Sequence, residues 1–160
     1  MPIIYESKYY ISEPLKLYNF IMDRIDNILI FNNKVINVKT GTIRLKDVHI
    51  SDGEEILFTG DVVIRQDAYS NLTMRFRHDN KTLFSISLGA YSSTENTESA
   101  GEREYLIKFL LSTRERPSGI EIEKLRRIAK LIEKKIYYLL RSDLNMIPVK
   151  DFGETAQETL

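Results

Sequence analysis

Residues 118–141 read SGIEIEKLRRIAKLIEKKIYYLLR, which is the pattern of one long amphipathic helix. Its apolar residues recur at steps of three and four and so share one stripe of a 3.6-residue helix. That apolar stripe consists of Ile122, Leu125, Ile128, Ala129, Ile132, Ile136, Leu139 and Leu140. Ser118 and Glu121 have the spacing of a capping box, which predicts the start of the helix. Each buried side chain contributes about 1.5–3 kcal/mol, so the rest of the chain must supply a broad apolar surface to receive this helix.

The middle of the chain is predicted to supply that surface as a sheet. Apolar and polar residues alternate there with a period of two, which is typical of half-buried strands. The predicted strands are residues 28–38, 42–50, 55–65, 71–78, 82–91 and 103–114. Short turn sequences such as Asp52-Gly53 and Asp79-Asn80 separate them, and only the polar run 92–101 makes a longer loop. Short turns indicate an antiparallel meander with one apolar and one polar face.

The alternation predicts which side chains face the helix. In the strand 55–65 the inward set is Ile56, Phe58, Val62 and Ile64. In the next three strands the inward sets are Leu72, Met74 and Phe76, then Phe84, Ile86 and Leu88, then Tyr105, Ile107, Phe109 and Leu111.

The N-terminal part is predicted to be a strand that leads into a short helix. Residues 3–11 read as the strand, and Ser12-Glu13-Pro14 has the form of a helix start with Ser12 as the N-cap. Apolar residues then follow at helical spacing as far as Ile25, and residues 23–28 fit either a second helical turn or a loop.

Composition limits the class of protein. The 160 residues suit one domain, predicted at residues 1–144, followed by a flexible tail at 145–160. The 23 basic and 23 acidic residues cancel, so no overall field draws the chain to nucleic acid. Cysteine is absent, which excludes disulfides and thiolate metal sites. No segment reads as a membrane span or a signal peptide, so we expect a cytoplasmic protein. The abundance of Ile, Lys and Glu would suit a thermophile.

The order of elements resembles the helix-grip fold of the START and Bet v 1-like (SRPBCC) superfamily. Two stretches carry the likeness: residues 11–21, ISEPLKLYNFI, look like its passage from first strand to first helix, and residues 109–140 look like its last strand, turn and long helix. The nearest branch is the small carbon monoxide dehydrogenase G-like and polyketide cyclase-like proteins. The chain departs from the usual form between Phe20 and Ile28, where little length remains for a second helix.

This resemblance implies an α+β domain in which a curved antiparallel sheet, of about seven strands, wraps around the C-terminal helix. It also implies a cavity between sheet and helix for a lipid-like, polyketide-like or other small apolar ligand. Other members of the superfamily act as assembly or regulatory proteins, so a protein-interaction module with a filled core is the alternative. The expected ligand-binding residues are Phe58, Val62, Met74, Phe76, Phe84, Ile86, Tyr105, Phe109, Ile128 and Ile132.

The sequence gives no positive support to catalysis, a metal site or a cofactor. His49 and His78 each stand near a strand end without a second ligand at metal-binding spacing, and we interpret both as surface residues. No nucleophile elbow or phosphate-binding loop is present. The basic residues of the long helix, Lys124 among them, alternate with glutamates, which favours a self-paired solvated face over a nucleic-acid interface. Arg75 and Arg77 lie on the polar sheet face and would extend this basic patch only if the two faces meet.

Overall fold

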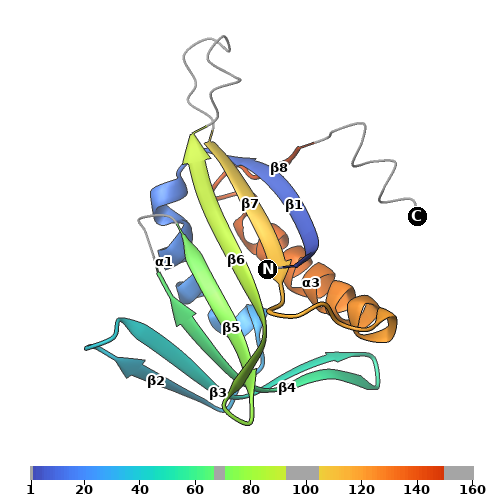
Figure 1. Ribbon diagram of the computed structural model, residues 1–160. Coiled ribbons are helices and arrows are strands. Elements are labelled where there is room, and N and C mark those ends of the chain that lie inside the picture. Colours follow the sequence, from blue (N-terminus) through green and yellow to red (C-terminus); the bar gives the residue numbers. More distant parts are fainter. Residues whose placement is uncertain (1, 67–70, 93–104, 150–160) are drawn as a thin grey trace.

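The computed structural model describes residues 2–66, 71–92 and 105–149 (Figure 1). An antiparallel sheet of eight strands, in the order β2-β3-β4-β5-β6-β7-β1-β8, forms the body of the molecule. Its strands are β1 (Ile3–Ile11), β2 (Asn33–Asn37), β3 (Thr42–Asp52), β4 (Glu55–Arg65), β5 (Leu72–His78), β6 (Lys81–Ser92), β7 (Tyr105–Ser112) and β8 (Ile147–Pro148). The helices are a 3₁₀ turn η1 (Pro14–Lys16), α1 (Leu17–Asp23), α2 (Ile25–Ile28) and the long α3 (Gly119–Leu140).

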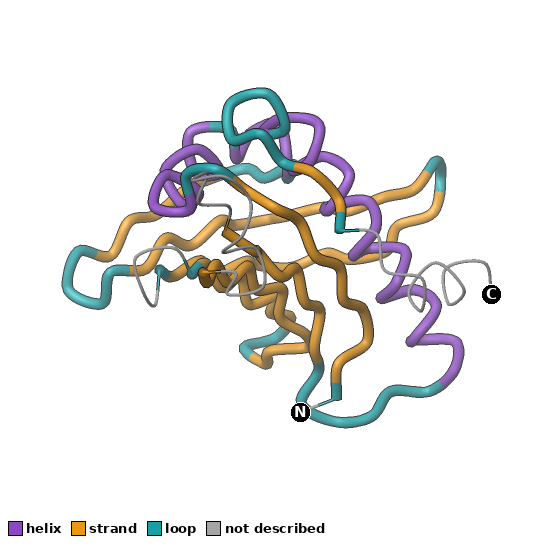
Figure 2. Tube along the Cα trace, turned by 90° about the horizontal axis from the view of Figure 1, so that it is seen from above, coloured by secondary structure: helices purple, strands orange, loops and turns teal. Residues whose placement is uncertain are grey.

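The helices lie on one face of the curved sheet, as Figure 2 shows. Helix α3 packs against β1 and β7 and against the two short helices. This is the α+β helix-grip architecture predicted from the sequence, with one strand more than the roughly seven expected.

Helix α3 begins where the capping box predicts. The Ser118 side chain accepts a hydrogen bond from the backbone N–H of Glu121, which satisfies one of the free donors of the first turn. The buried stripe of the helix is shorter than the predicted one and consists of Ile128, Ala129, Ile132, Ile136 and Leu140.

The sheet buries the face that alternation predicts, with one correction in β4. Leu72, Met74 and Phe76 are fully buried, and so are Val62 and Ile64. Ile56, predicted to point inward, is 59% exposed, whereas its neighbour Leu57 is 5% exposed. The pairing of β3 with β4 shifts register between Ile50 and Ser51, which leaves Leu57 without a partner between Ile56 and Phe58. Such a bulge interrupts the alternation of side chains between the two faces.

The entry into the first helices differs from the prediction. Ser12 does not cap a helix, because its hydroxyl and its backbone N–H both donate to the carbonyl of Leu144, each at 3.0 Å. The turn η1 instead follows Glu13, whose side chain makes no capping bond. The second helical turn, α2, lies within residues 23–28, where the sequence allowed either such a turn or a loop. Strand β2 begins at Asn33, later than the predicted strand 28–38, and all its residues are exposed.

The chain stays in contact with the sheet beyond the domain boundary predicted at Leu144. Leu144 and Met146 are buried, and β8 pairs with β1 through Tyr9↔Pro148 and Tyr10↔Ile147. The rest of the predicted tail, residues 150–160, and residues 93–101 of the predicted loop lie outside the described residues.

Candidate functional site

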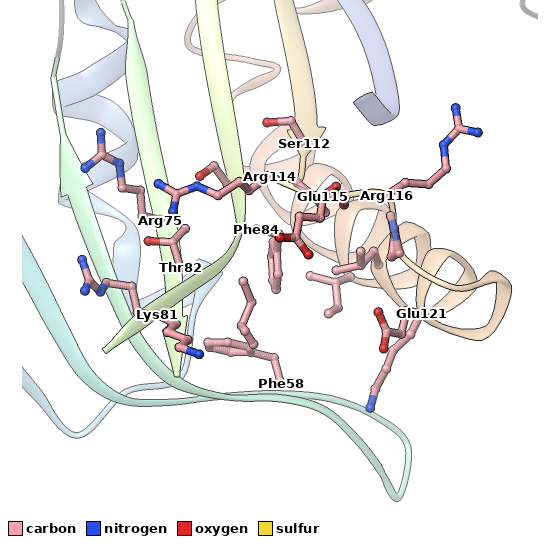
Figure 3. A pocket seen from close by; sticks show the side chains of 18 of the residues that line it. Phe58, Arg75, Lys81, Thr82, Phe84, Ser112, Arg114, Glu115, Arg116 and Glu121 are labelled. Carbon is pink, nitrogen blue, oxygen red and sulfur yellow. Dashed lines mark hydrogen bonds between the residues drawn. The ribbon is translucent and has the colours of Figure 1, made fainter. Parts of the chain in front are cut away.

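The difference in length between β6 and β7 opens the sheet at one end. The pairing of β6 with β7 starts at Ser85↔Ser112, although β6 itself begins at Lys81. After Ser112 the chain leaves the sheet and crosses to the start of α3. A groove with a volume of about 1010 Å³ lies between the free end of β6, this connection and the first turns of α3 (Figure 3).

The floor of the groove is apolar. It is made by Leu57, Phe58 and Phe84 from the sheet and by Leu125 and Ile128 from the helix. Phe84 stacks on Phe76 with 4.5 Å between ring centroids, and Phe58 meets Phe84 edge to face at 5.6 Å. These ring contacts place the floor on top of the aromatic core and fix its shape.

The rim of the groove is mostly basic. Six cationic residues line it against two carboxylates, Glu115 and Glu121. The cationic residues are Arg75, Arg77, Lys81, Arg114, Arg116 and Lys124. Within the described residues none of these six forms an ion pair, so their charge is not neutralised locally.

A buried threonine fixes the connection between β7 and α3. Thr113 is 6% exposed, and its hydroxyl donates to the carbonyl of Glu115 at 2.6 Å. Its backbone N–H donates to the carbonyl of Pro2 at 3.0 Å. One bond ties the connection to the residue before β1 and the other tightens its first turn, so both anchor the backbone from which Arg114 to Arg116 extend.

An ion-pair bridge joins α3 to the tip of the β3–β4 hairpin beside the groove. Arg127 donates to Asp52 and to Glu55, each at 2.8 Å. Hydrogen bonds to these two carboxylates raise the pKa of Arg127 above its ordinary value. All three side chains are exposed to solvent to a large extent, so the bridge positions the hairpin more than it stabilises the fold.

A second polar cluster lies under the other half of α3, away from the groove. The hydroxyls of Tyr5 and Ser7 on β1 donate to the Glu133 carboxylate. Burial first, and then the Glu133 charge, raise the pKa of the nearby Tyr9 phenol. The cluster gives a partly buried carboxylate the hydrogen-bond donors that it needs, and it ties β1 to the helix.

The residues predicted from the sequence to bind a ligand fall into two groups. Phe58, Phe84 and Ile128 line the groove. The others lie in the hydrophobic core, except Tyr105, which is partly buried at the opposite end of β7: they are Val62, Met74, Phe76, Ile86, Phe109 and Ile132. Whether these buried residues also contact a ligand stays a prediction.

The two histidines lie where the sequence places them, on the surface. His49 and His78 are both exposed. Among residues 2–66, 71–92 and 105–149, no group of three or more histidines and acids is arranged to hold a metal ion. No helix in the described part of the chain is long and apolar enough to cross a membrane.

Sequence reasoning missed the basic rim as a unit. It noted Arg75 and Arg77 on the sheet and Lys124 on the helix, and joined them only on the condition that the two faces meet. The structure brings these residues together around one opening. The available signal was the charged run Arg114-Glu115-Arg116, which stands between a strand and a helix cap and so must cross from one layer to the other.

Comparisons with known proteins give a distant likeness. No protein-family model matches the chain, and no curated protein matches it either. A crystal structure of Ara h 8.0201, a Bet v 1-family allergen, aligns with 14% identity and a TM-score of 0.40. The alignment covers 85% of this chain and 96% of that one. The narrower resemblance to the carbon monoxide dehydrogenase G-like proteins stays a prediction from the sequence.

Proposed function

We propose that the protein binds a small, largely apolar ligand in this groove without transforming it. The observation that carries the proposal is the apolar floor of five side chains under an opening of about 1010 Å³. Ligand sites are concave, about 300–1,000 Å³ in volume, mostly apolar and provided with a few polar groups that orient the ligand. The groove has the concave shape, a volume at the upper end of this range and an apolar floor, and charged or polar side chains make up the rest of its lining.

The proposal places the ligand at the open end of the sheet rather than deep between sheet and helix. Phe58, Phe76 and Phe84 contact one another ring to ring below the groove. Met74, Ile86 and Phe109 are almost completely buried around them. A core filled in this way favours binding on its upper surface, because entry into it would require the rings to separate.

The lining of the groove supports binding rather than catalysis. Its residues include neither histidine nor cysteine, and its hydroxyls have no general base beside them among the described contacts. A hydroxyl nucleophile needs such a base within hydrogen-bond reach. Cytoplasmic location and origin in a thermophile remain predictions from composition.

A tryptophan at the edge of the groove tests this function. Leu125 lies on the floor and is partly exposed, so Leu125→Trp should cover part of the floor and narrow the groove without disturbing the core. We expect this variant to bind Nile red, a neutral apolar dye, at least tenfold more weakly. A loss of about 1.4 kcal/mol in binding free energy is enough for that change. Fluorescence titration measures the affinity.

The matched control is Leu131→Trp, which makes the same change on α3 at a partly buried leucine outside the groove. It should bind the dye like the unmodified protein. Equal binding by the unmodified protein and both variants would place the dye elsewhere and contradict the proposal. Mass spectrometry of a solvent extract from the denatured protein would then look for a natural ligand.

The β2 edge of the sheet favours a second candidate function, contact with a protein partner. Val35, Ile36 and Val38 on this hairpin are 42%, 62% and 89% exposed. Strand β2 is also the outermost strand, and an unpaired edge offers its backbone groups to another chain. This observation supports the alternative hypothesis from the sequence, that the protein is a protein-interaction module.

A charge on that edge separates the two candidates. Ile36→Lys should abolish co-purification of a specific partner, whereas Ile120→Lys, at a site 84% exposed on α3, should not. Neither change touches the groove lining, so dye binding should be unaffected in both variants. A partner retained by the Ile36→Lys variant would contradict this role for β2.

A further inference from the structure

We infer that the ligand carries an anionic group, a carboxylate or a phosphate, which Lys81 and Arg114 bind while the apolar part lies on the floor. This inference rests on the proposed function and adds the chemical class of the ligand. The two cations come from different elements, β6 and the connection from β7 to α3. Both line the same groove as Phe84.

The charge distribution is the first argument. The chain as a whole has a net charge of zero. Around the groove, however, six cationic residues stand against two carboxylates, and none of the six has an ion-pair partner in the described part of the chain. A concave site lined by one sign of charge attracts the opposite charge more strongly than an open surface does.

The arrangement of the side chains is the second argument. Figure 3 shows the Arg114 side chain extended toward Thr82 on β6, whereas Arg116 points away from the groove. Arg114 therefore extends from the helix side past β6 toward the sheet cations, and Lys81 stands at the start of the same strand. A guanidinium can form two parallel hydrogen bonds with a carboxylate or phosphate, and an ammonium adds a further donor.

A rigid turn sets the position of Lys81. Asp79 and Asn80 have φ values of 51° and 62° and form the two-residue connection between His78 and Lys81. Arg77 donates to the carbonyl of Asn80 at 2.7 Å and so braces this turn. Because the lysine backbone is held in advance, binding an anion orders little more than its side chain.

The two carboxylates fix where the anionic group lies. Glu115 belongs to the connection and Glu121 to α3, so both lie on the helix side of the groove. Arg75 and Arg77 lie on β5, on the sheet side. The anion is therefore expected beside β6, away from the glutamates and next to the cations of the sheet.

Two ligands that differ only in charge test the inference. Octanoate and octanol have the same apolar chain, so calorimetric titration of each with the full-length protein isolates the contribution of the carboxylate. We expect octanoate to bind about tenfold more tightly than octanol, which is the effect of one charge-assisted hydrogen bond of ordinary strength. The preference should weaken as the salt concentration rises.

Single substitutions test which residues cause the preference for octanoate over octanol. Lys81→Gln and Arg114→Gln should each reduce the ratio of octanoate affinity to octanol affinity severalfold. Glu115→Gln should increase the preference, because it removes a repelling charge from the groove. Lys130→Gln removes an exposed lysine of α3 outside the groove and should have no effect.

Each outcome decides a separate point. Equal binding of octanoate and octanol, or a preference unchanged by Lys81→Gln and Arg114→Gln, would overturn the inference and leave the proposed function intact. Competition by inorganic phosphate alone as strong as that by octanoate would show a site for free anions instead of an amphiphile. No binding of either compound would overturn the proposed function, and this inference with it.

Discussion

Gly60 marks the closest approach of β4 to its neighbour β5. A Cβ atom at this position would lie 2.1 Å from the carbonyl oxygen of Arg77 and 2.9 Å from the Phe58 ring, and the residue has a φ of 154°. Gly60→Ala should therefore lower the free energy of unfolding by at least about 3 kcal/mol, because both the contact and the backbone conformation become strained. Urea denaturation monitored by circular dichroism measures the change.

Gly41 provides the matched control for this substitution. It has a φ of 67°, but a Cβ there would meet nothing within 4 Å. Gly41→Ala should cost only the backbone penalty of about 1–2 kcal/mol. Equal effects of the two substitutions would show that the close approach at Gly60 contributes nothing.

Tyr9 should make stability depend on pH in the alkaline range. Its pKa is raised above the ordinary value of 10.0, first by burial and then by the Glu133 charge. The folded state therefore holds this proton more tightly than the unfolded chain does. The resulting stability is complete below pH 10 and is lost as the pH rises from 10 toward the folded pKa, at up to about 1.4 kcal/mol per pH unit.

Removal of the phenol group tests this dependence. In the Tyr9→Phe variant the free energy of unfolding should fall less steeply with pH above about 10 than in the unmodified protein. Urea unfolding at several alkaline pH values gives both slopes. If the slopes are the same, Tyr9 does not retain its proton in the way that its burial predicts.

At the scale of elements, the segment that follows α3 adds the edge strand β8 to the sheet. Met146, just before this strand, is expected to supply most of the stability of the segment. Met146 is 4% exposed, whereas Ile147 is 55% exposed. Met146→Ala should cost about 2–5 kcal/mol through lost burial and the cavity that remains. Ile147→Ala should change stability by no more than about 0.5 kcal/mol. Thermal unfolding of both variants distinguishes a docked segment from a loosely attached one, for which the two values would agree.

Elements with a strong period could be predicted from the sequence. The bounds of β1 and β4, and those of α3 within a residue or two, follow from alternation, helical spacing and a capping serine. The failures have local causes. Ile56 keeps the alternation, but a bulge separates it from Phe58, and the sequence pattern does not show a bulge. Strand β8 has only two residues, too few for any period, and its partner β1 is distant in the sequence.

For the whole molecule, the continuous core predicts a single unfolding transition. Buried residues from β1, from β3 to β7 and from all three α-helices form one hydrophobic cluster. A domain with one core unfolds as a unit, so far-UV circular dichroism and tyrosine fluorescence should give the same urea midpoint. Separate midpoints would show that α3 or the β2–β3 hairpin detaches on its own.

The candidate site could be predicted only in part, because it exists only at the scale of the whole fold. Phe58, Phe84 and Ile128 were found through the period of their own elements. Lys81 and Arg114 are separated by more than thirty positions, and nothing local distinguishes them from other surface cations. What joins them is that β6 extends past the end of β7, which is a property of strand pairing.

The position of β1 between β7 and β8 has a consequence for the order in which the protein is made. Strand β1 leaves the ribosome well before both of its neighbours, which lie at residues 105–112 and 147–148. It must therefore wait unpaired, with its tyrosines and isoleucines exposed, until β7 has been synthesised on one side and β8 on the other. Such distant pairing slows folding and lengthens the time in which a nascent chain depends on chaperones.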